Sequence, residues 1–434
     1  MAFIGRFVAL LLVTATLATA DSARSSGLNR TWTSKDGATV DMELRSIDGP
    51  TAVFLSADSR KIELPLSRLS DADQLLAHEW WDALPRPLVW PEIVEVETRT
   101  LEVLPLPKEA REGWYLYRTE HFEFHSQAEL ANSLVKDIAR VFEATLRLVE
   151  ELPWSVDPSP ATGTHYLAEL YQSRASYVQA GGPSNSGGVY SPKEKKFMVP
   201  FESLGVKRVG GKFTRADRYE VDTLVHEITH QAMHFWLNFL PKWYIEGTAE
   251  FTELIPYHYG KFRLDRIEVG LKEYLEERSG SIYPIQELFT MGHQKWAEIS
   301  TDYATQSRLY TSSLILTYYF MHLDGDGDGA RIQRYLGKVD KLRASWQTFS
   351  DHYKIYEDEF AVFLKNPGVV DNSDGTFTYP TSLTPPARPA LPLPKDQMDK
   401  ADLANLDLLL DGRTPAELEE EMRVKYREAG FRGL

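Results

Sequence analysis

The hydrophobic pattern divides the chain into parts with different expected secondary structure. Between residues 28 and 70, apolar and polar residues alternate in short runs that are separated by Asp-Gly turns. Alternation over four to eight residues, with a turn about every ten residues, predicts short antiparallel strands that form a small barrel. We therefore expect an all-β module over residues 28–75, with a short helix at its end.

A second pattern covers residues 114–364. Between residues 128 and 152, apolar residues recur three and four positions apart, which predicts a long amphipathic helix. Strand-like runs precede and follow it at residues 121–125, 164–170 and 197–201. Helical patterns dominate after Thr214, so we expect a mixed α+β domain over residues 113–365.

Proline-rich stretches separate these parts from each other and from the C-terminus. They are expected to act as linkers over residues 76–112 and 366–395, the second in an extended or polyproline conformation. Residues 396–434 are expected to form a tail of two helices. The second helix should begin at Thr414, which is followed by a proline and by the capping-box residue Glu417.

Residues 1–20 have the pattern of a signal peptide. A single arginine precedes an apolar run, and the segment ends with the small residues Ala18-Thr19-Ala20. The run is shorter than the roughly 20 apolar residues that a membrane-spanning helix needs. We therefore expect cleavage after Ala20, no stable membrane span, and a secreted or periplasmic protein.

Composition and charge exclude several classes of function. The 434 residues include 48 lysines and arginines against 63 aspartates and glutamates, a net charge of −15. This excess of acid argues against nucleic acid as a partner, because phosphates require a basic surface. The chain has no cysteine, which excludes disulfides, thiolate nucleophiles, iron–sulfur clusters and cysteine-type zinc sites.

The sequence His-Glu-x-x-His, at residues 226–230, carries the first candidate chemistry. It falls within a helix that is expected from Thr214 to about Leu237. A spacing of four places His226 and His230 on one helix face, where two imidazoles can share a metal ion such as Zn²⁺. Glu227 projects beside them and can hold a water molecule. The alternative is a surface helix with two solvated histidines.

A second pair of candidate residues follows on the next predicted helix, after the break at Pro241. Glu246 and Glu250 lie one turn apart and therefore share a face. Three protein ligands with one open position are typical of a catalytic zinc site, and a zinc-bound histidine needs an acceptor at its other ring nitrogen. One glutamate would be the third ligand, and the other would be the outer-shell acceptor for a zinc-bound histidine. The alternative is two solvated charges.

Together the two motifs, H-E-x-x-H and W-x-x-E-G-x-A-E, resemble those of the gluzincin (MA-clan) zinc metallopeptidases, in particular a bacterial branch. The resemblance implies a zincin-like peptidase domain in which His226, His230 and Glu246 bind zinc. It implies that Glu227 is the general base for peptide-bond hydrolysis by zinc-activated water. It also implies that Glu250 is a second-shell acid oriented towards a ligand histidine.

Two further elements are candidates for substrate contacts. Tyr310 lies where the resemblance implies a tyrosine that stabilises the oxyanion, whereas the alternative is an aromatic residue of the core. Gly188, Val189 and Tyr190 follow a glycine-rich loop and could form an edge strand that pairs with an extended peptide. The alternative for these three residues is a surface hairpin. His234 lacks the spacing of a third histidine ligand.

The N-terminal module resembles the Sla-homology type of SH3-like domain. The resemblance rests on an R-x-W-T-x-x-D-G opening and a P-L-x-x-L-S-x-x-D close. These residues are Arg30, Trp32, Thr33, Asp36, Gly37, Pro65, Leu66, Leu69, Ser70 and Asp73. Ser59-Arg60 stands where the family has a second Asp-Gly hairpin. The resemblance implies a peptide or protein partner, by analogy with adaptor proteins.

The sequence thus predicts a secreted zinc metallopeptidase with a peptide or protein substrate. One alternative is a catalytically silent binding or scaffold protein that retains the zincin fold, and another is hydrolysis of a non-peptide amide. The segment from Asp324 to Gly329 resembles the start of a calcium-binding loop. However, the twelfth position is Tyr335 instead of glutamate, so a turn between helices is expected there.

Overall fold

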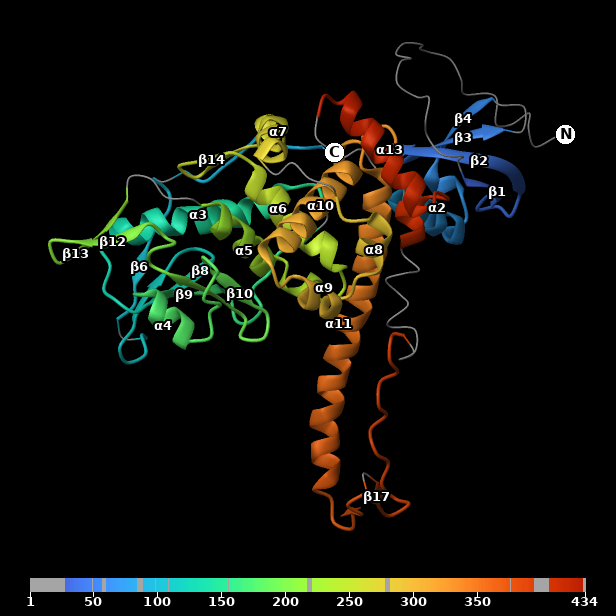
Figure 1. The fold of residues 1–434 in the computed structure, drawn as a ribbon. Coiled ribbons are helices and arrows are strands. Elements are labelled where there is room, and N and C mark those ends of the chain that lie inside the picture. The colour runs from blue at the N-terminus through green and yellow to red at the C-terminus, as the bar shows by residue number, and fades with distance from the viewer. Residues whose placement is uncertain are drawn as a thin grey trace. The chain divides into compact units, whose positions relative to one another are not determined.

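The computed structural model describes residues 28–48, 50–56, 60–83, 89–97, 99–107, 109–154, 156–216, 221–277, 282–374, 376–393 and 406–431 (Figure 1). The predicted signal peptide, Ser59 and residues 396–405 of the predicted C-terminal tail lie outside these residues. The chain divides into two compact units, residues 1–84 and 85–434, which are described separately below.

The N-terminal unit contains a four-stranded antiparallel sheet in which neighbours along the chain are neighbours in space. Its elements are β1(Leu28–Thr33), β2(Thr39–Asp48), β3(Thr51–Ser56), β4(Lys61–Pro65), the 3₁₀ helix η2(Leu66–Arg68) and α2(Asp71–Ala83). The predicted β-sheet region and its short terminal helix are therefore both present. A bulge between Leu44 and Ser46 shifts the register of β2 against β3.

The motif residues of this unit have structural roles. Trp32 is fully buried, donates its indole N–H to the carbonyl of Met42 at 2.9 Å, and packs edge-to-face on Phe54. Asp73, at the start of α2, accepts the backbone N–H of Thr33 at 2.6 Å and forms an ion pair with Arg30 at 3.1 Å. These contacts hold α2 against β1 and explain the spacing of the tryptophan and the aspartate.

The second unit is built on a six-stranded mixed sheet in the order β10-β11-β9-β8-β7-β6. The strands are β6(Leu104–Pro105), β7(Tyr115–Arg118), β8(Phe122–Ser126), β9(Tyr166–Tyr171), β10(Val189–Ser191) and β11(Lys196–Pro200). The pairs β8–β9 and β9–β11 are parallel, and the other pairs are antiparallel. Among the residues that the structure describes, β10 pairs only with β11, so it is an edge of the sheet.

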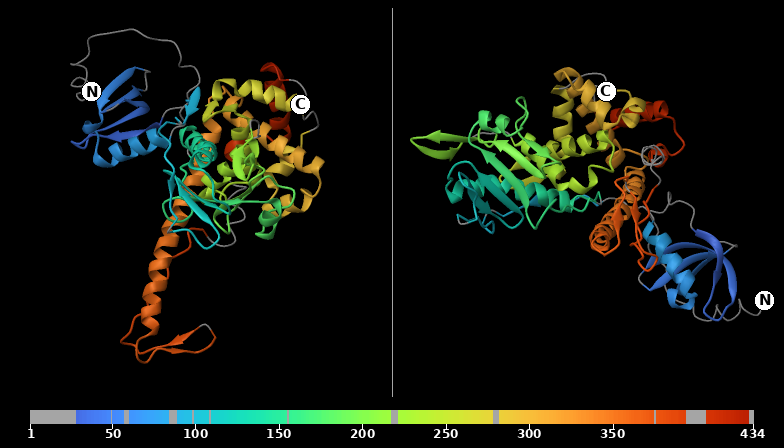
Figure 2. Two further views of the ribbon diagram at one scale, coloured as in Figure 1. Left: turned by 90° about the vertical axis from the view of Figure 1, so that its left-hand side faces the viewer. Right: turned by 90° about the horizontal axis from the view of Figure 1, so that it is seen from below.

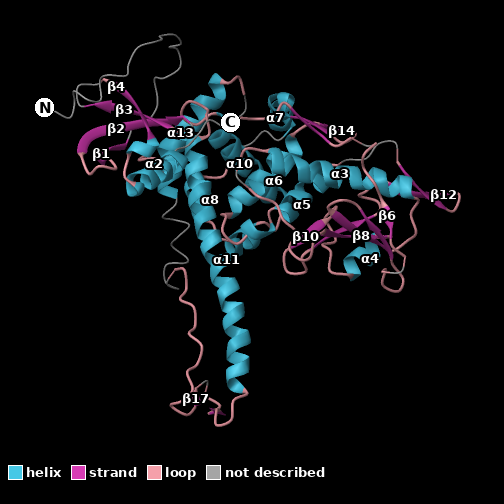
Figure 3. Ribbon diagram, turned by 180° about the vertical axis from the view of Figure 1, so that it is seen from behind, coloured by secondary structure: helices cyan, strands magenta, loops and turns pink. Residues whose placement is uncertain are grey.

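The two faces of this sheet are covered by different helices. Phe142 of α3(Asn132–Glu151) packs on Phe122, Phe124 and Phe197, which share one face. Helix α4(Arg174–Gln179) lies on the opposite face (Figures 1 and 3). Because side chains alternate along a strand, Glu169 and Tyr171 of β9 point to the α4 face while Ala168 and Leu170 point to α3.

Helices dominate the rest of the second unit, as the sequence predicts. They include α5(Asp222–Ala232), α6(Lys242–Leu254), α7(Ile267–Glu277), α8(Ile285–Thr290), α9(His293–Ile299), α10(Tyr303–His322) and the 3₁₀ helices η3(His234–Trp236) and η4(Leu264–Arg266). The helix expected from Thr214 begins only at Asp222. Strands β12(Val206–Val209) and β13(Lys212–Arg215) form a hairpin before it, around the turn Gly210-Gly211, whose φ angles of 55° and 85° favour glycine.

The segment expected to be a linker at residues 76–112 contains ordered elements. It includes the end of α2, strand β6 of the large sheet, and β5(Ile93–Glu95). Strand β5 forms a small sheet with β14(Tyr257–His258) and β15(Lys261–Arg263). Val94 is buried in the same core as α3, so this part of the segment belongs to the second unit.

Helix α11(Ala330–Leu364) extends away from the other helices of this unit, with β16(Val370–Asp371) and β17(Phe377–Thr378) at its far end (Figures 1 and 2). Its buried residues are Ile332, Tyr335, Leu336, Val339 and Phe363. Six aromatic residues along α11, three and four positions apart in turn, contact one another in sequence. They are Trp346, Phe349, Tyr353, Tyr356, Phe360 and Phe363. The proline-rich return segment contacts these aromatic residues, since Arg388 lies 5.4 Å from the ring centre of Tyr353.

The C-terminal helix α13(Pro415–Glu428) packs into the main core of the second unit. Leu418, Met422 and Tyr426 are buried there, and the Tyr426 hydroxyl donates to the carbonyl of Ile315 in α10 at 2.7 Å. The predicted N-cap Thr414 and capping-box Glu417 bond as expected. Residues 406–431 of the segment expected to be a tail are therefore part of the same folded unit.

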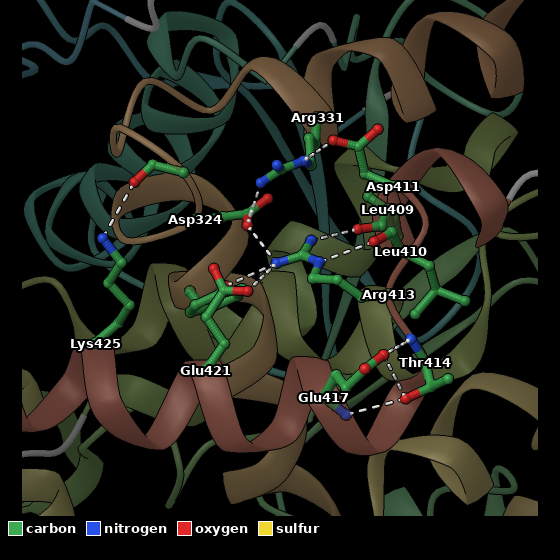
Figure 4. A network of polar contacts seen from close by, with 12 residues as sticks. Asp324, Arg331, Leu409, Leu410, Asp411, Arg413, Thr414, Glu417, Glu421 and Lys425 are labelled. Atoms are coloured by element: carbon green, nitrogen blue, oxygen red, sulfur yellow. Dashed lines mark hydrogen bonds and ion pairs between the residues drawn. The ribbon is translucent and has the colours of Figure 1, made fainter.

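An ion network around the buried Asp324 joins α13 to the turn between α10 and α11 (Figure 4). Asp324 accepts hydrogen bonds from Arg331 at 2.6 Å and from Arg413 at 3.1 Å, and Arg413 also binds Glu421 at 2.9 Å. The first aspartate of the calcium-like sequence is thus engaged by two arginines, in the inter-helix turn that the sequence predicts. In the part of the chain that the structure describes, no helix is both long and apolar enough to cross a membrane.

Candidate metal site

Helices α5 and α6 bring the three predicted metal ligands together. Nε2 of His226 lies 3.2 Å from Oε2 of Glu246, and Nε2 of His230 lies 3.4 Å from the same oxygen. The imidazole rings of the two histidines are 4.7 Å apart, centre to centre. Glu246 is only 2% exposed, so the three side chains converge inside the protein instead of on a solvated helix face.

The distances between these atoms would allow the three side chains to hold one metal ion. Zinc bonds to histidine nitrogen and carboxylate oxygen are about 2.0–2.2 Å long, so two ligand atoms of one tetrahedral ion are about 3.3 Å apart. The observed separations of 3.2 and 3.4 Å lie on either side of this value. The residues present are therefore of a kind that could hold a metal ion, and these two separations are compatible with zinc.

The environment of His226 also favours a cation. Its Nδ1 lies 3.0 Å from Oε2 of Glu253, while its Nε2 faces Glu246. A neutral imidazole has only one N–H, so it cannot donate to both carboxylates. Burial by itself lowers the pKa of His226, but Glu246 and Glu253 outweigh that effect and raise the pKa well above its usual range. A proton or a metal ion at Nε2 would let both ring nitrogens of His226 face a carboxylate favourably.

Glu253 is an outer-shell partner that the sequence analysis missed. Oε1 of Glu250, the predicted partner, lies 3.7 Å from Nδ1 of His226, and its Oε2 accepts a hydrogen bond from Tyr274 at 2.7 Å. Glu253 is the closer acceptor for His226. Its position seven residues after Glu246 places it on the same face of α6, and this periodicity is the signal that could have identified it.

Lys242 is a second residue of the site that the motifs did not indicate. Its ammonium group forms an ion pair with Oε1 of Glu246, one helical turn away. Burial alone raises the pKa of Glu246, but Lys242, His230 and His226 together hold that pKa well below its usual range. Glu246 is therefore an ionised carboxylate with one oxygen bound to Lys242 and the other facing both histidines.

Glu227 lies at the junction between α5 and the edge strand. Its Oε2 accepts the backbone N–H of Tyr190 in β10 at 2.7 Å. The Tyr190 hydroxyl bonds Nδ1 of His234 at 2.7 Å, so His234 supports the edge strand and is not one of the metal ligands. The structure thus places Tyr190, the last of the three predicted substrate-binding residues, next to the predicted base. Val189 and Tyr190 lie in a true edge strand, directly after Gly188.

Tyr310 lies beside His226, on α10. Its ring centre is 6.0 Å from that of His226, and Gln306 donates to its hydroxyl at 3.5 Å. Burial, reinforced by the charge of Glu246, raises the pKa of Tyr310 well above its usual value. The hydroxyl therefore keeps its proton and can donate a hydrogen bond at neutral pH.

Gly247 follows the third ligand and allows α6 and α10 to approach closely. A Cβ at this position would overlap the Thr317 hydroxyl and the backbone carbonyl of Ser313. Gly247→Ala is therefore expected to destabilise the protein by about 1–3 kcal/mol and to displace Glu246. Urea unfolding would measure the change. The control is Gly337→Ala in α11, which has open space around the added methyl and should not destabilise the protein; equal stabilities would contradict the prediction.

Comparison of the sequence with models of known protein families finds no matching family, and a search of curated proteins finds no match. The interpretation of the site therefore rests on the side chains themselves. Their arrangement combines three convergent ligand atoms, an adjacent carboxylate at an edge strand and a protonated tyrosine hydroxyl.

Proposed function

We propose that the second unit is a zincin-like domain and that the protein is a zinc-dependent metallopeptidase of the gluzincin type. The observation that carries this proposal is the convergence of the His226, His230 and Glu246 ligand atoms at separations of 3.2 and 3.4 Å. His226 and His230 come from one helix and Glu246 from the next, as the motifs imply. Three protein ligands leave a position for water or substrate, as catalytic zinc sites do.

When bound, zinc would lower the pKa of a coordinated water molecule and polarise the carbonyl that is attacked. Glu227 would accept the proton of the attacking water and pass it to the leaving amine. The Tyr190 amide holds one oxygen of this carboxylate, and the other oxygen would take the proton. Tyr310 would donate its hydroxyl proton to the developing oxyanion.

The edge strand offers a binding site for an extended substrate. Strand β10 pairs with β11 through Val189, Tyr190 and Ser191. The backbone N–H of Tyr190 points away from β11, towards Glu227. In a strand the N–H and C=O of one residue point to the same side, so the Tyr190 carbonyl also faces away from the sheet. It can accept a hydrogen bond from the backbone of an extended peptide.

Metal analysis combined with a peptide-library assay tests this proposal. The full-length protein should contain about one zinc per chain, lose activity on dialysis against a chelator, and regain it when zinc is added. A wild-type protein that binds no zinc would overturn the metal site. Zinc bound without cleavage of any peptide would favour the scaffold alternative or a non-peptide amide as substrate.

Tyr310→Phe tests the role of the tyrosine hydroxyl. Because the hydroxyl would bind the oxyanion only as it forms, kcat should fall about tenfold to hundredfold while KM changes little. Steady-state kinetics on a peptide from the library would measure both. Tyr303→Phe is the matched control, since Tyr303 is 80% exposed on the same helix. An unchanged kcat for Tyr310→Phe would identify Tyr310 as a packing residue only.

The proposal extends to location and to the N-terminal unit. Residues 1–20 have the pattern of a cleaved signal peptide, which supports export to the periplasm or the medium. The N-terminal sheet and α2 retain the SH3-like motif residues, and we propose that this module binds a peptide or protein partner. Export would be tested by N-terminal sequencing of the mature protein, which should begin at Asp21.

A further inference from the structure

A polar cavity of about 350 Å³ lies on the α4 face of the large sheet, on the other side of the sheet from α3. This volume is at the lower end of the range for small-ligand sites. The cavity is lined by Arg111, Trp114, Gln127, Glu169, Tyr171, Ser176, Gln179, Ala180 and Lys196. None of these residues belongs to the candidate metal site, so an occupant would be recognised independently of the proposed peptidase activity.

The floor of the cavity carries a surplus positive charge. The Glu169 side chain is 4% exposed and accepts from Arg111 at 2.6 Å, from Lys196 at 2.9 Å and from the Tyr171 hydroxyl at 2.5 Å. Burial raises the pKa of Glu169, but Tyr171, Lys196 and Arg111 lower it overall, so the carboxylate is ionised. Two cations against one carboxylate leave one positive charge.

The cations of the floor have donors to spare. In the part of the chain that the structure describes, Arg111 and Lys196 form ion pairs only with Glu169. A guanidinium has five N–H donors and an ammonium has three, so most of them remain for a ligand. The Gln127 amide oxygen accepts from Ser176 and from the backbone of Gln172, which leaves the amide nitrogen as a further donor.

The arginine is held in place before any ligand binds. Its guanidinium carbon lies 3.7 Å from the ring centre of Trp114, and the Trp114 ring meets Tyr171 edge-on at 5.6 Å. The contact with the Trp114 indole and the bond to Glu169 fix the orientation of the planar Arg111 guanidinium. A ligand therefore does not have to order this side chain, which improves affinity. The same rings provide an apolar wall.

We propose that this cavity binds a carboxylate that carries an apolar or aromatic group. A guanidinium fork matches the two oxygens of a carboxylate. A single negative charge neutralises the surplus charge of the floor, whereas a phosphate dianion would exceed it. The apolar group would lie against Trp114, Tyr171 and Ala180. Such a carboxylate can be a free small acid or the C-terminus of a peptide.

Isothermal titration calorimetry with the full-length protein distinguishes these ligands. Phenylacetate should bind with a Kd in the millimolar range or lower, and more tightly than inorganic phosphate does. The peptide N-acetyl-Gly-Gly-Phe and its C-terminal amide form the second arm. Binding of the free-acid peptide more tightly than phenylacetate, with no binding of the amide, would identify a peptide C-terminus as the source.

Two variants and a control show whether the binding measured by calorimetry takes place in this cavity. Arg111→Gln and Lys196→Gln each leave Glu169 one cationic partner, and each should weaken carboxylate binding about tenfold or more. Arg118→Gln is the control, because Arg118 forms comparable ion pairs with Glu109 and Glu123 outside the cavity. Circular dichroism would verify folding, and either variant suffices if the other is unfolded. No carboxylate binding by the wild type, unchanged affinity in both variants, or tighter binding of phosphate would overturn the proposal.

Discussion

Glu227→Gln is expected to abolish peptide hydrolysis while the protein still binds one zinc per chain. Glutamine has nearly the same shape and its amide oxygen can still accept the Tyr190 N–H, but it cannot take a proton from water. Loss of a general base typically reduces the rate by a factor of about 10²–10⁴. The kcat/KM on a library peptide and the zinc content of the same sample would be measured together.

The control for this experiment is Glu194→Gln. Glu194 is an exposed residue of the turn between β10 and β11, so its loss should change neither zinc content nor rate. A Glu227→Gln protein that keeps more than a tenth of the wild-type kcat/KM would contradict the assigned role. If peptide cleavage is equal in both variants, the activity comes from another site or from a contaminant.

Glu246→Gln should weaken zinc binding by more than a factor of 100 and thereby remove activity. The substitution exchanges the carboxylate proposed as third ligand, which is buried against Lys242, for a neutral amide. Glu253→Gln should have a smaller effect, about 10- to 100-fold on zinc affinity, because it removes only the acceptor for His226. Zinc affinity would be measured by competition with a chromophoric chelator.

Glu250→Gln completes this comparison and assigns the third ligand. Glu250 lies 3.7 Å from the ring nitrogen of His226 and hydrogen-bonds Tyr274, so its loss should change zinc affinity less than the loss of Glu253 does. A larger effect for Glu250→Gln than for Glu246→Gln would identify Glu250 as the ligand and overturn the assignment. Thermal unfolding of the metal-free Glu246→Gln protein would show whether Lys242, without the charge of Glu246 beside it, destabilises the fold.

The mixed α+β class and the main helices could be predicted because their signals are local. The predicted helix at 128–152 is present as Asn132–Glu151, and the predicted strand at 197–201 is present as Lys196–Pro200. Apolar periodicity reports which face of an element is buried, and it is strongest in long helices. The hairpin at 206–215 was missed, since the glycine pair at its turn interrupts a pattern that otherwise continues into α5.

The spacing of the metal motifs placed two histidines on one face of α5, and the three candidate ligands do converge. Spacing along one helix could not show how α6 is rotated against α5. That rotation decides that Glu253 approaches His226 more closely than Glu250 does. Lys242 has the i, i+4 spacing to Glu246, but such pairs are common on solvated helices and carry little information without burial.

The role of the C-terminal region could not be predicted because its contacts are long-range. Proline content marked residues 366–395 as a linker, yet Tyr379 packs edge-on against Phe363 of α11. The apolar residues of α13 predicted an amphipathic helix without showing which surface it covers. Arg413 finds its buried partner Asp324 89 residues earlier in the chain, and a pattern in one sequence does not encode such a pairing.

The position of α13 has a consequence for the order of events during synthesis. The bond from Tyr426 to Ile315 spans 111 residues, and that from Tyr319 to Glu421 spans 102. A nascent chain therefore carries both candidate zinc-binding helices well before the helix that covers α10 leaves the ribosome. Such distant contacts slow folding and keep the unfinished core exposed. For a proposed exported hydrolase, late closure of the core would delay maturation of the site until α13 has been synthesised.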